Sequence, residues 1–168
     1  MALNNSIIQE KLVAQFGEDM FSFSEQYGML CLEAPTEQNL KVLQFLYDEP
    51  TLSFQFLTDL CAVHDPENTG KEICVVYHLQ NMAANVRIRM KVYTAAAEPK
   101  VFTATRLFEA ANWMERETYD FYGVQFIGHP NLKRVLNVDE MDYFPLRKEY
   151  PLEDQTRIDK DVQMFGRE

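Results

Sequence analysis

Residues 112–134, NWMERETYDFYGVQFIGHPNLKR, decide how the second half of the chain folds. Apolar residues recur there at helical spacings, which predicts an amphipathic helix. The helix should end at Gly123, because glycine readily takes the left-handed conformation that closes a helix. A turn at Gly128, His129 and Pro130 and a short basic segment follow. The stripe that this periodicity places on the buried face is Ala110, Trp113, Met114, Glu117 and Phe121.

A carboxylate in the middle of this stripe needs an explanation, because a buried acid must be paired, hydrogen-bonded or neutralised. Glu117 holds that place, with Arg116 and Asp120 beside the stripe and Glu115 on the opposite face. We interpret the helix and the segment after it as a charge-locked unit. The alternatives are a surface helix with solvated acids and a catalytic carboxylate pair, although no nucleophile or metal-ligand set accompanies it. The candidate cations are His129, Lys133, Arg134, Arg147 and Lys148.

Three ordered blocks of residues carry a resemblance to a known family. The chain resembles the 30-kDa subunit of respiratory complex I, which in bacteria is the C-type subunit of NADH-quinone oxidoreductase. Lys133 stands where this family often has arginine, and Tyr122 where it often has phenylalanine. The blocks are Glu115-Arg116-Glu117-x-x-Asp120-Phe121-Tyr122-Gly123, Gly128-His129-Pro130-x-Leu132-x-Arg134-x-Leu136, and Pro145-Leu146-Arg147-Lys148-x-Tyr150-Pro151-Leu152.

The resemblance implies a non-catalytic subunit of a proton-pumping complex that passes electrons from NADH through iron–sulfur clusters to a quinone. It implies a place in the peripheral arm, near the quinone-reducing module and on the cytoplasmic side of the bacterial inner membrane. The implied partners are the 49-kDa-type subunit and the cluster-bearing connecting subunits. NADH, flavin, clusters and quinone would be bound by other subunits. The residues expected in structural or interface roles are Glu115, Arg116, Glu117, Asp120, His129, Lys133, Arg134, Arg147 and Lys148.

Two other functions remain open at this point. Membrane-bound ion-pumping hydrogenases carry a related subunit, and the motif does not fully separate the two complexes. A function from another class is a stand-alone enzyme that uses Glu117, Asp120 and His129 as acid–base or metal groups. Asp120 and His129 form a dyad only if the fold brings them together, and we expect an ion pair that holds the turn instead.

Length and composition predict one globular domain. The 168 residues are 46% hydrophobic and 12% aromatic, and the net charge is −10. This charge argues against nucleic acid and against direct binding to an anionic membrane surface. No stretch approaches the ~18 apolar residues of a membrane span, and the N-terminus does not read as a secretory signal. We predict a single domain over residues 1–148 and an extended charged arm over 149–168, which becomes ordered against another protein.

Cofactor motifs are not found in the sequence. Cys31, Cys61 and Cys74 lie far apart without a CxxC pair, so we expect free thiols rather than a cluster or zinc site. The chain has no glycine-rich dinucleotide motif and no Walker A sequence. We therefore expect this chain to bind no cofactor and to be non-catalytic when isolated.

The first half of the chain alternates short helices and strands. A helix over 6–16 is expected, capped by Asn5 or Ser6, followed by two antiparallel strands within 20–33. A second helix should begin at Thr36 as N-cap and end before Pro50, and 52–60 is ambiguous between helix and strand.

The clearest hairpin pairs residues 73–80 with 85–93. In its second strand Arg87, Arg89 and Lys91 alternate with apolar residues and share one face. These cations form either a docking stripe or a solvated or acid-paired sheet face. Because hairpins dominate, we predict an α+β fold, a mostly antiparallel sheet with helices packed on one side, followed by the extended charged C-terminal arm.

Overall fold

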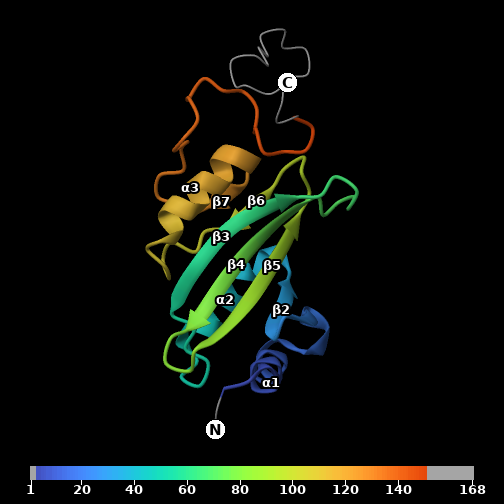
Figure 1. Ribbon diagram of the computed structural model, residues 1–168, viewed down its shortest axis with the longest axis vertical. Coiled ribbons are helices and arrows are strands. Elements are labelled where there is room, and N and C mark those ends of the chain that lie inside the picture. Colours follow the sequence, from blue (N-terminus) through green and yellow to red (C-terminus); the bar gives the residue numbers. More distant parts are fainter. Residues whose placement is uncertain (1–2, 151–168) are drawn as a thin grey trace, which may run out of the picture.

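The computed structural model describes residues 3–150 and has the predicted α+β fold (Figure 1). No helix among these residues is both long and apolar enough to cross a membrane. The predicted arm lies outside the described residues beyond Tyr150 and stays a prediction. The helices and strands are α1 (Asn5–Phe16), β1 (Ser22–Gln26), β2 (Met29–Ala34), α2 (Asn39–Asp48), β3 (Phe56–His64), β4 (Ile73–Asn81), β5 (Val86–Thr94), β6 (Lys100–Phe102), α3 (Ala111–Tyr122) and β7 (Gln125–Ile127).

Five strands form the main sheet in the order β1-β2-β5-β4-β3. All neighbours are antiparallel except β2 and β5, which are parallel. The parallel pair arises because the β4–β5 hairpin lies between β2 and β3, so that α2 connects two strands running in the same direction. The predicted hairpins are confirmed, whereas the sequence did not predict the parallel pair.

The core lies between one face of the sheet and the helices α1 and α2. Alternate residues of β4 and β5 point into it, and each fully buried aliphatic side chain contributes about 1.5–3 kcal/mol. In Figure 1, β3, β4 and β5 lie in front of α2, and the other face of β4 and β5 is not covered by a described helix. The core side chains include Ile8, Leu12, Val42, Leu43, Leu46, Ile73, Val75, Tyr77, Leu79, Ile88, Met90 and Val92.

A β-bulge explains why residues 52–60 are ambiguous in the sequence. Leu57 pairs with Leu79 and Leu60 with Tyr77, but the register shifts at Thr58. The extra residue lets Leu57 and Leu60, three apart, both face the core, although a regular strand alternates with a period of two. The helix-like spacing is therefore produced by a strand.

Two predicted helix caps are wrong. Asn4, not Asn5 or Ser6, caps α1, and its side chain accepts a hydrogen bond from the N–H of Ile7 at 2.9 Å. Thr36 begins a 3-10 turn, Thr36–Gln38, before α2. Its hydroxyl donates to the carbonyl of Tyr93 at 2.8 Å, so it ties this turn to β5 instead.

A second, two-stranded sheet carries α3. β6 and β7 are parallel, and α3 is the crossover between them. Each strand has three residues, too few for a periodic pattern, so this unit was not predicted from the sequence. α3 also packs along β3 at the edge of the main sheet (Figure 1).

Candidate functional site: a helix that holds an irregular segment

The buried face of α3 differs from the predicted one. Glu115 and Asp120 are fully buried, whereas Glu117 is exposed and Trp113 is 60% exposed. The prediction that Glu117 is buried and that Glu115 lies on the outer face is therefore wrong. The inward face is polar because residues that follow β6 and β7 supply hydrogen-bond partners, and no apolar periodicity marks such a face.

Glu115 is hydrogen-bonded next to the main core. The hydroxyl of Thr103 donates to one carboxyl oxygen at 2.5 Å, and the N–H of Ala104 donates to the other at 2.6 Å. Burial raises the pKa of Glu115 to about 7, although these two hydrogen bonds act in the opposite direction. Burial, and then the proximity of Glu115, also raise the pKa of Tyr77. Glu115 is thus a buried acid that can be neutral near pH 7.

Asp120 is the centre of the charge network. One carboxylate oxygen accepts from Nη1 of Arg134 at 2.7 Å and from the side-chain amide of Asn137 at 3.1 Å. The other accepts from the backbone N–H groups of Val135, Leu136 and Asn137 at 3.0, 2.8 and 3.0 Å. Burial alone would raise the pKa of Asp120, but these hydrogen bonds hold it well below its ordinary value. Asp120 therefore stays ionised and binds the chain at 134–137.

Arg134 extends this network to the chain beyond it. Its side chain is 8% exposed, and its Nη2 donates to the carbonyls of Met141 and Tyr143 at 2.7 and 3.0 Å. Its guanidinium also lies 5.3 Å from the ring centre of Phe144. One arginine thus fixes residues 134–144, which contain no helix or strand, against the C-terminal end of α3.

Arg116 and Arg147 fix the two ends of the same segment. Arg116 donates to the carbonyls of Lys133 and Arg134 at 3.2 Å each. Arg147 donates through Nε to the carbonyl of Tyr122 at 2.8 Å, which satisfies one of the free carbonyls at the end of α3.

Gly123 makes the close contact at this helix end possible. It has φ 78°, in the left-handed region, and a Cβ built there would lie 2.5 Å from the ring of Phe144. The predicted glycine stop is confirmed.

The remaining predicted residues do not converge on a reactive site. Nδ1 of His129 accepts from the N–H of Asn131 at 3.0 Å, so Nε2 carries the proton and donates to the carbonyl of Asn112 at 3.2 Å. His129 therefore does not contact Asp120, and the acid–base dyad and the alternative ion pair between them are both wrong. The side chains of Lys133 and Lys148 are exposed.

Glu117 lies on the rim of a groove between α3 and β3. The groove has a volume of about 450 Å³, and Asp59, Cys61, Phe121 and Leu146 also line it. Its walls are mainly apolar, with the carboxylates of Asp59 and Glu117 on them. Such a groove fits an apolar side chain with a cation beside it better than it fits an anionic ligand.

Large apolar side chains of residues 134–144 point to solvent. Leu136 is 67% exposed and Val138 63%, and Trp113 on α3 adds a third exposed apolar side chain. Contacts to Asp120 and Arg134 keep the backbone that carries Leu136 and Val138 in place. An ordered segment that exposes apolar side chains is typical of a protein–protein interface.

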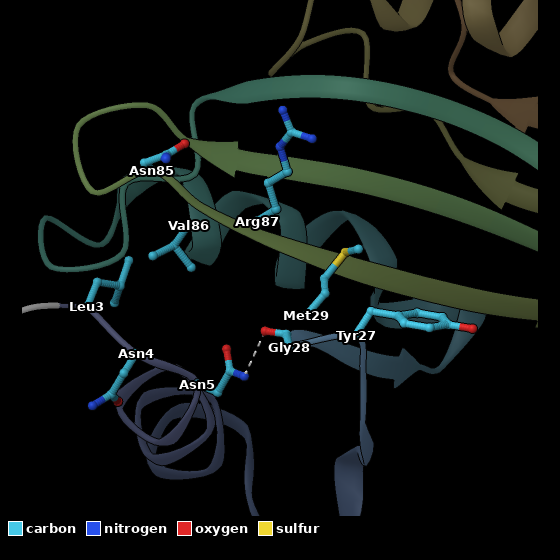
Figure 2. A pocket seen from close by; sticks show the side chains of 9 residues that line it. All are labelled: Leu3, Asn4, Asn5, Tyr27, Gly28, Met29, Asn85, Val86 and Arg87. Carbon is cyan, nitrogen blue, oxygen red and sulfur yellow. Dashed lines mark hydrogen bonds between the residues drawn. The ribbon is translucent and has the colours of Figure 1, made fainter.

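Other hollows and polar clusters do not form a chemical site. An open hollow of about 670 Å³ lies where α1, the β1–β2 turn and the β4–β5 turn meet. Figure 2 shows that Arg87 points away from Asn4 and Asn5, which line this hollow. The side-chain amide of Asn5 donates a hydrogen bond to the carbonyl of Gly28. Within residues 3–150, no group of three or more His, Cys, Asp or Glu side chains is placed to hold a metal ion.

Several residues of the site were not singled out in the sequence. Asn137, Phe144 and the carbonyls of 133 and 134 complete the network around Asp120, Arg134 and Arg116. His64, far away in the sequence, accepts from the N–H of Lys148 through Nδ1 at 2.9 Å. A single asparagine or histidine outside any periodic pattern cannot be recognised from the sequence as part of such a hydrogen-bond network.

Comparison with known proteins identifies the family of the chain. The model of the respiratory-chain NADH dehydrogenase 30-kDa subunit family matches residues 32–156. The chain is 39% identical over 154 residues to the C-type subunit of NADH-quinone oxidoreductase from Methylorubrum populi, covering 90% of this chain and 69% of the relative. It is 44% identical over 125 residues to the same subunit from Xanthobacter autotrophicus, covering 74% and 59%. These names do not favour the hydrogenase alternative.

Two solved structures share the fold. The trypsin-resistant fragment (1-134) of Nqo5 is 27% identical with a TM-score of 0.62, covering 74% of this chain and 99% of the fragment. A chain of an archaeal membrane-bound sulfane sulfur reductase is 20% identical with a TM-score of 0.73, covering 93% and 96%, which shows the fold alone. With the family match over most of its length and these relatives, the chain belongs to the family of the 30-kDa subunit of respiratory-chain NADH dehydrogenase.

Proposed function

We propose that this chain is a non-catalytic subunit of an NADH-quinone oxidoreductase and that α3 with residues 131–150 is its docking surface. The observation that carries the proposal is the network of Asp120 and Arg134, which holds an irregular segment in one conformation with Leu136 and Val138 facing solvent. The names of the relatives support the identity of the complex.

Ordering the segment in advance favours binding. A loop that becomes fixed only in a complex loses conformational entropy at that step, about 1–2 kcal/mol per residue for the backbone. Here the contacts of Asp120, Arg116 and Arg147 supply the order within the chain itself. The apolar side chains can then bury surface on a partner without that additional cost.

The partners in this proposal are the 49-kDa-type subunit and the cluster-bearing connecting subunits, in the peripheral arm on the cytoplasmic side of the membrane. NADH, flavin, clusters and quinone are bound by other subunits. The groove beside Glu117 and Asp59 would receive a basic or apolar side chain of the partner. Asp120 is not the acid of a reaction, since its carboxylate is occupied by five donor groups.

Co-purification of the complex tests this function. The double variant Leu136→Asp with Val138→Asp places two charges on the exposed apolar surface and leaves the buried network intact. We expect a loss of at least tenfold in the amount of the 49-kDa-type subunit that co-purifies with the tagged chain, because charges at an interface core leave desolvated groups unpaired.

The control is Met82→Asp in the β4–β5 turn, where Met82 is 64% exposed. Figure 1 shows this turn at the far end of the strands from α3. It should leave co-purification unchanged. Equal yields of the 49-kDa-type subunit with the double variant and the natural chain would refute the docking surface. Oxidoreductase turnover by the purified chain alone would refute its non-catalytic role.

A further inference from the structure

The outer face of the main sheet carries a row of cations on β5. Arg87, Arg89 and Lys91 alternate with the core residues Ile88 and Met90, so they share the face that points away from the core. No described helix crosses in front of β4 and β5 on this side, and α3 packs only along the edge strand β3 (Figure 1). Alternate residues of a strand lie about 6.6–6.8 Å apart, so the three charges form a regular line.

The hydrogen bonds of this row are made with neutral groups. Arg89 donates through Nε to Nε2 of His78 at 2.9 Å, and Arg87 donates to the side-chain oxygen of Gln80 at 3.1 Å. His78 accepts there, so it is neutral, and burial and the positive charge of Arg89 lower its pKa. Within the described part of the chain none of the three cations forms an ion pair with a carboxylate. Acid pairing therefore does not account for the row.

The surroundings give this face the shape and composition of a binding surface. Phe56 and Val63 on β3 are 48% and 49% exposed, and their register partners Gln80 and Cys74 place them on the same outer face. With about 4.8 Å between strands and about 3.3 Å per residue, the axes of the nine-residue strands β3, β4 and β5 span roughly 10 by 30 Å. Such an area suits a short segment of a partner, because a whole stable protein interface takes ~800 Å² from each side.

We propose that this face binds a carboxylate-rich segment of a partner protein in the assembled complex, along the line of Arg87, Arg89 and Lys91. A segment with acids at every second residue of an extended chain matches the spacing of the cations. The exposed Phe56 and Val63 supply apolar contacts beside the charges. The inference rests on the proposed function for the complex, but the row lies on β5, two strands away from the groove between β3 and α3.

Charge balance favours a protein over a polyanion. Three cations stand on a chain with a net charge of −10, and carboxylates lie on both sides of the row. Glu33 is the register partner of Lys91, and Asp59 is that of His78. Nucleic acids and anionic membranes require a broad positive surface, whereas a short acidic segment requires only a narrow one.

Photo-cross-linking in the intact complex tests the proposal. Phe56 is replaced by benzoylphenylalanine in the tagged full-length chain, the complex is purified and irradiated, and the cross-linked peptide is sequenced. The control places the same residue at Phe102 on β6, which is 36% exposed. We expect Phe56, but not Phe102, to cross-link to one partner subunit within a few residues of two or more Asp or Glu side chains.

Charge-neutralised variants then test the row itself. Replacing Arg87, Arg89 and Lys91 by glutamine should lower the cross-link yield about fivefold or more, because three surface charge contacts are lost. The control Lys41→Gln, Lys100→Gln and Arg106→Gln removes the same charge elsewhere and should leave the yield unchanged.

Each result separates this inference from the proposed function. If the tagged chain does not co-purify with the complex, the proposed function fails. If it co-purifies but Phe56 cross-links to a second copy of the chain, to nucleic acid, to lipid or to nothing, the acidic-segment proposal is overturned. An unchanged yield after neutralisation of the row overturns it as well.

Discussion

Replacing Asp120 by asparagine tests the charge that, with Arg134, holds residues 134–144. The substitution keeps the shape but turns one acceptor oxygen into an amide donor. In one orientation the new NH2 group faces Arg134 and the side-chain amide of Asn137. In the other it faces the backbone N–H groups of residues 135–137. In both cases a donor faces other donors. Breaking a buried charge pair costs about 3–5 kcal/mol, which corresponds to a factor of about a thousand in the opening equilibrium of the segment.

Hydrogen exchange of the Leu146 amide measures this opening. Leu146 donates to the carbonyl of Phe121 and makes no hydrogen bond to Asp120, so its protection reports whether the segment is docked. We expect exchange at Leu146 to accelerate by about a thousandfold in Asp120→Asn, with little change at Tyr77 in the sheet core. The control Glu117→Gln makes the same acid-to-amide change at an exposed position of α3 and should alter neither amide.

An increase of less than tenfold at Leu146 would refute the reasoning. Equal acceleration at Tyr77 would also refute it, because Asp120 would then stabilise the whole domain and not the segment alone. The pH dependence gives a second test. The pKa of Asp120 is below its ordinary value of 3.8, so its contribution to stability is present above about pH 4 and lost as the pH falls further. Asp120→Asn should lack this loss.

Two further predictions concern stability. Because the pKa of Glu115 is about 7 when folded against an ordinary 4.5, the native state binds the extra proton, so this stabilising contribution is full below pH 4.5 and is lost as the pH rises through 7. Glutamine at position 115 does not titrate, so Glu115→Gln should lack this loss. The free energy of unfolding of the variant minus that of the natural chain, from urea titrations, should therefore be up to about 3 kcal/mol larger at pH 8 than at pH 4. A difference that does not depend on pH would contradict this. Gly123→Ala should lower the free energy of unfolding by about 2 kcal/mol or more, through left-handed strain and the clash with Phe144. Phe144→Ala in the same chain should relieve part of that loss, and strictly additive effects would show that the clash is absent.

The sequence prediction failed on which side of α3 faces the interior. The pattern of Trp113, Met114 and Phe121 predicted the helix and its glycine stop correctly, but it placed Glu117 inside and Glu115 outside. Hydrophobic periodicity assumes that the inward face is apolar. Here the inward acids are satisfied by Thr103 and by the backbone at 135–137, which lie 12 to 17 residues away along the chain.

The sequence by itself determined that the chain folds as an α+β domain, where its main hairpin lies, and to which family it belongs. These features depend on local spacing, on glycine and proline, and on ordered blocks of residues that are visible without coordinates. Only the tertiary structure decided which acids of α3 are buried, which groups pair with Asp120, and that β5 presents uncovered cations. Burial and hydrogen bonding join residues that are distant along the chain, so their partners are set by how the strands and the segment after β7 pack, and not by any local pattern.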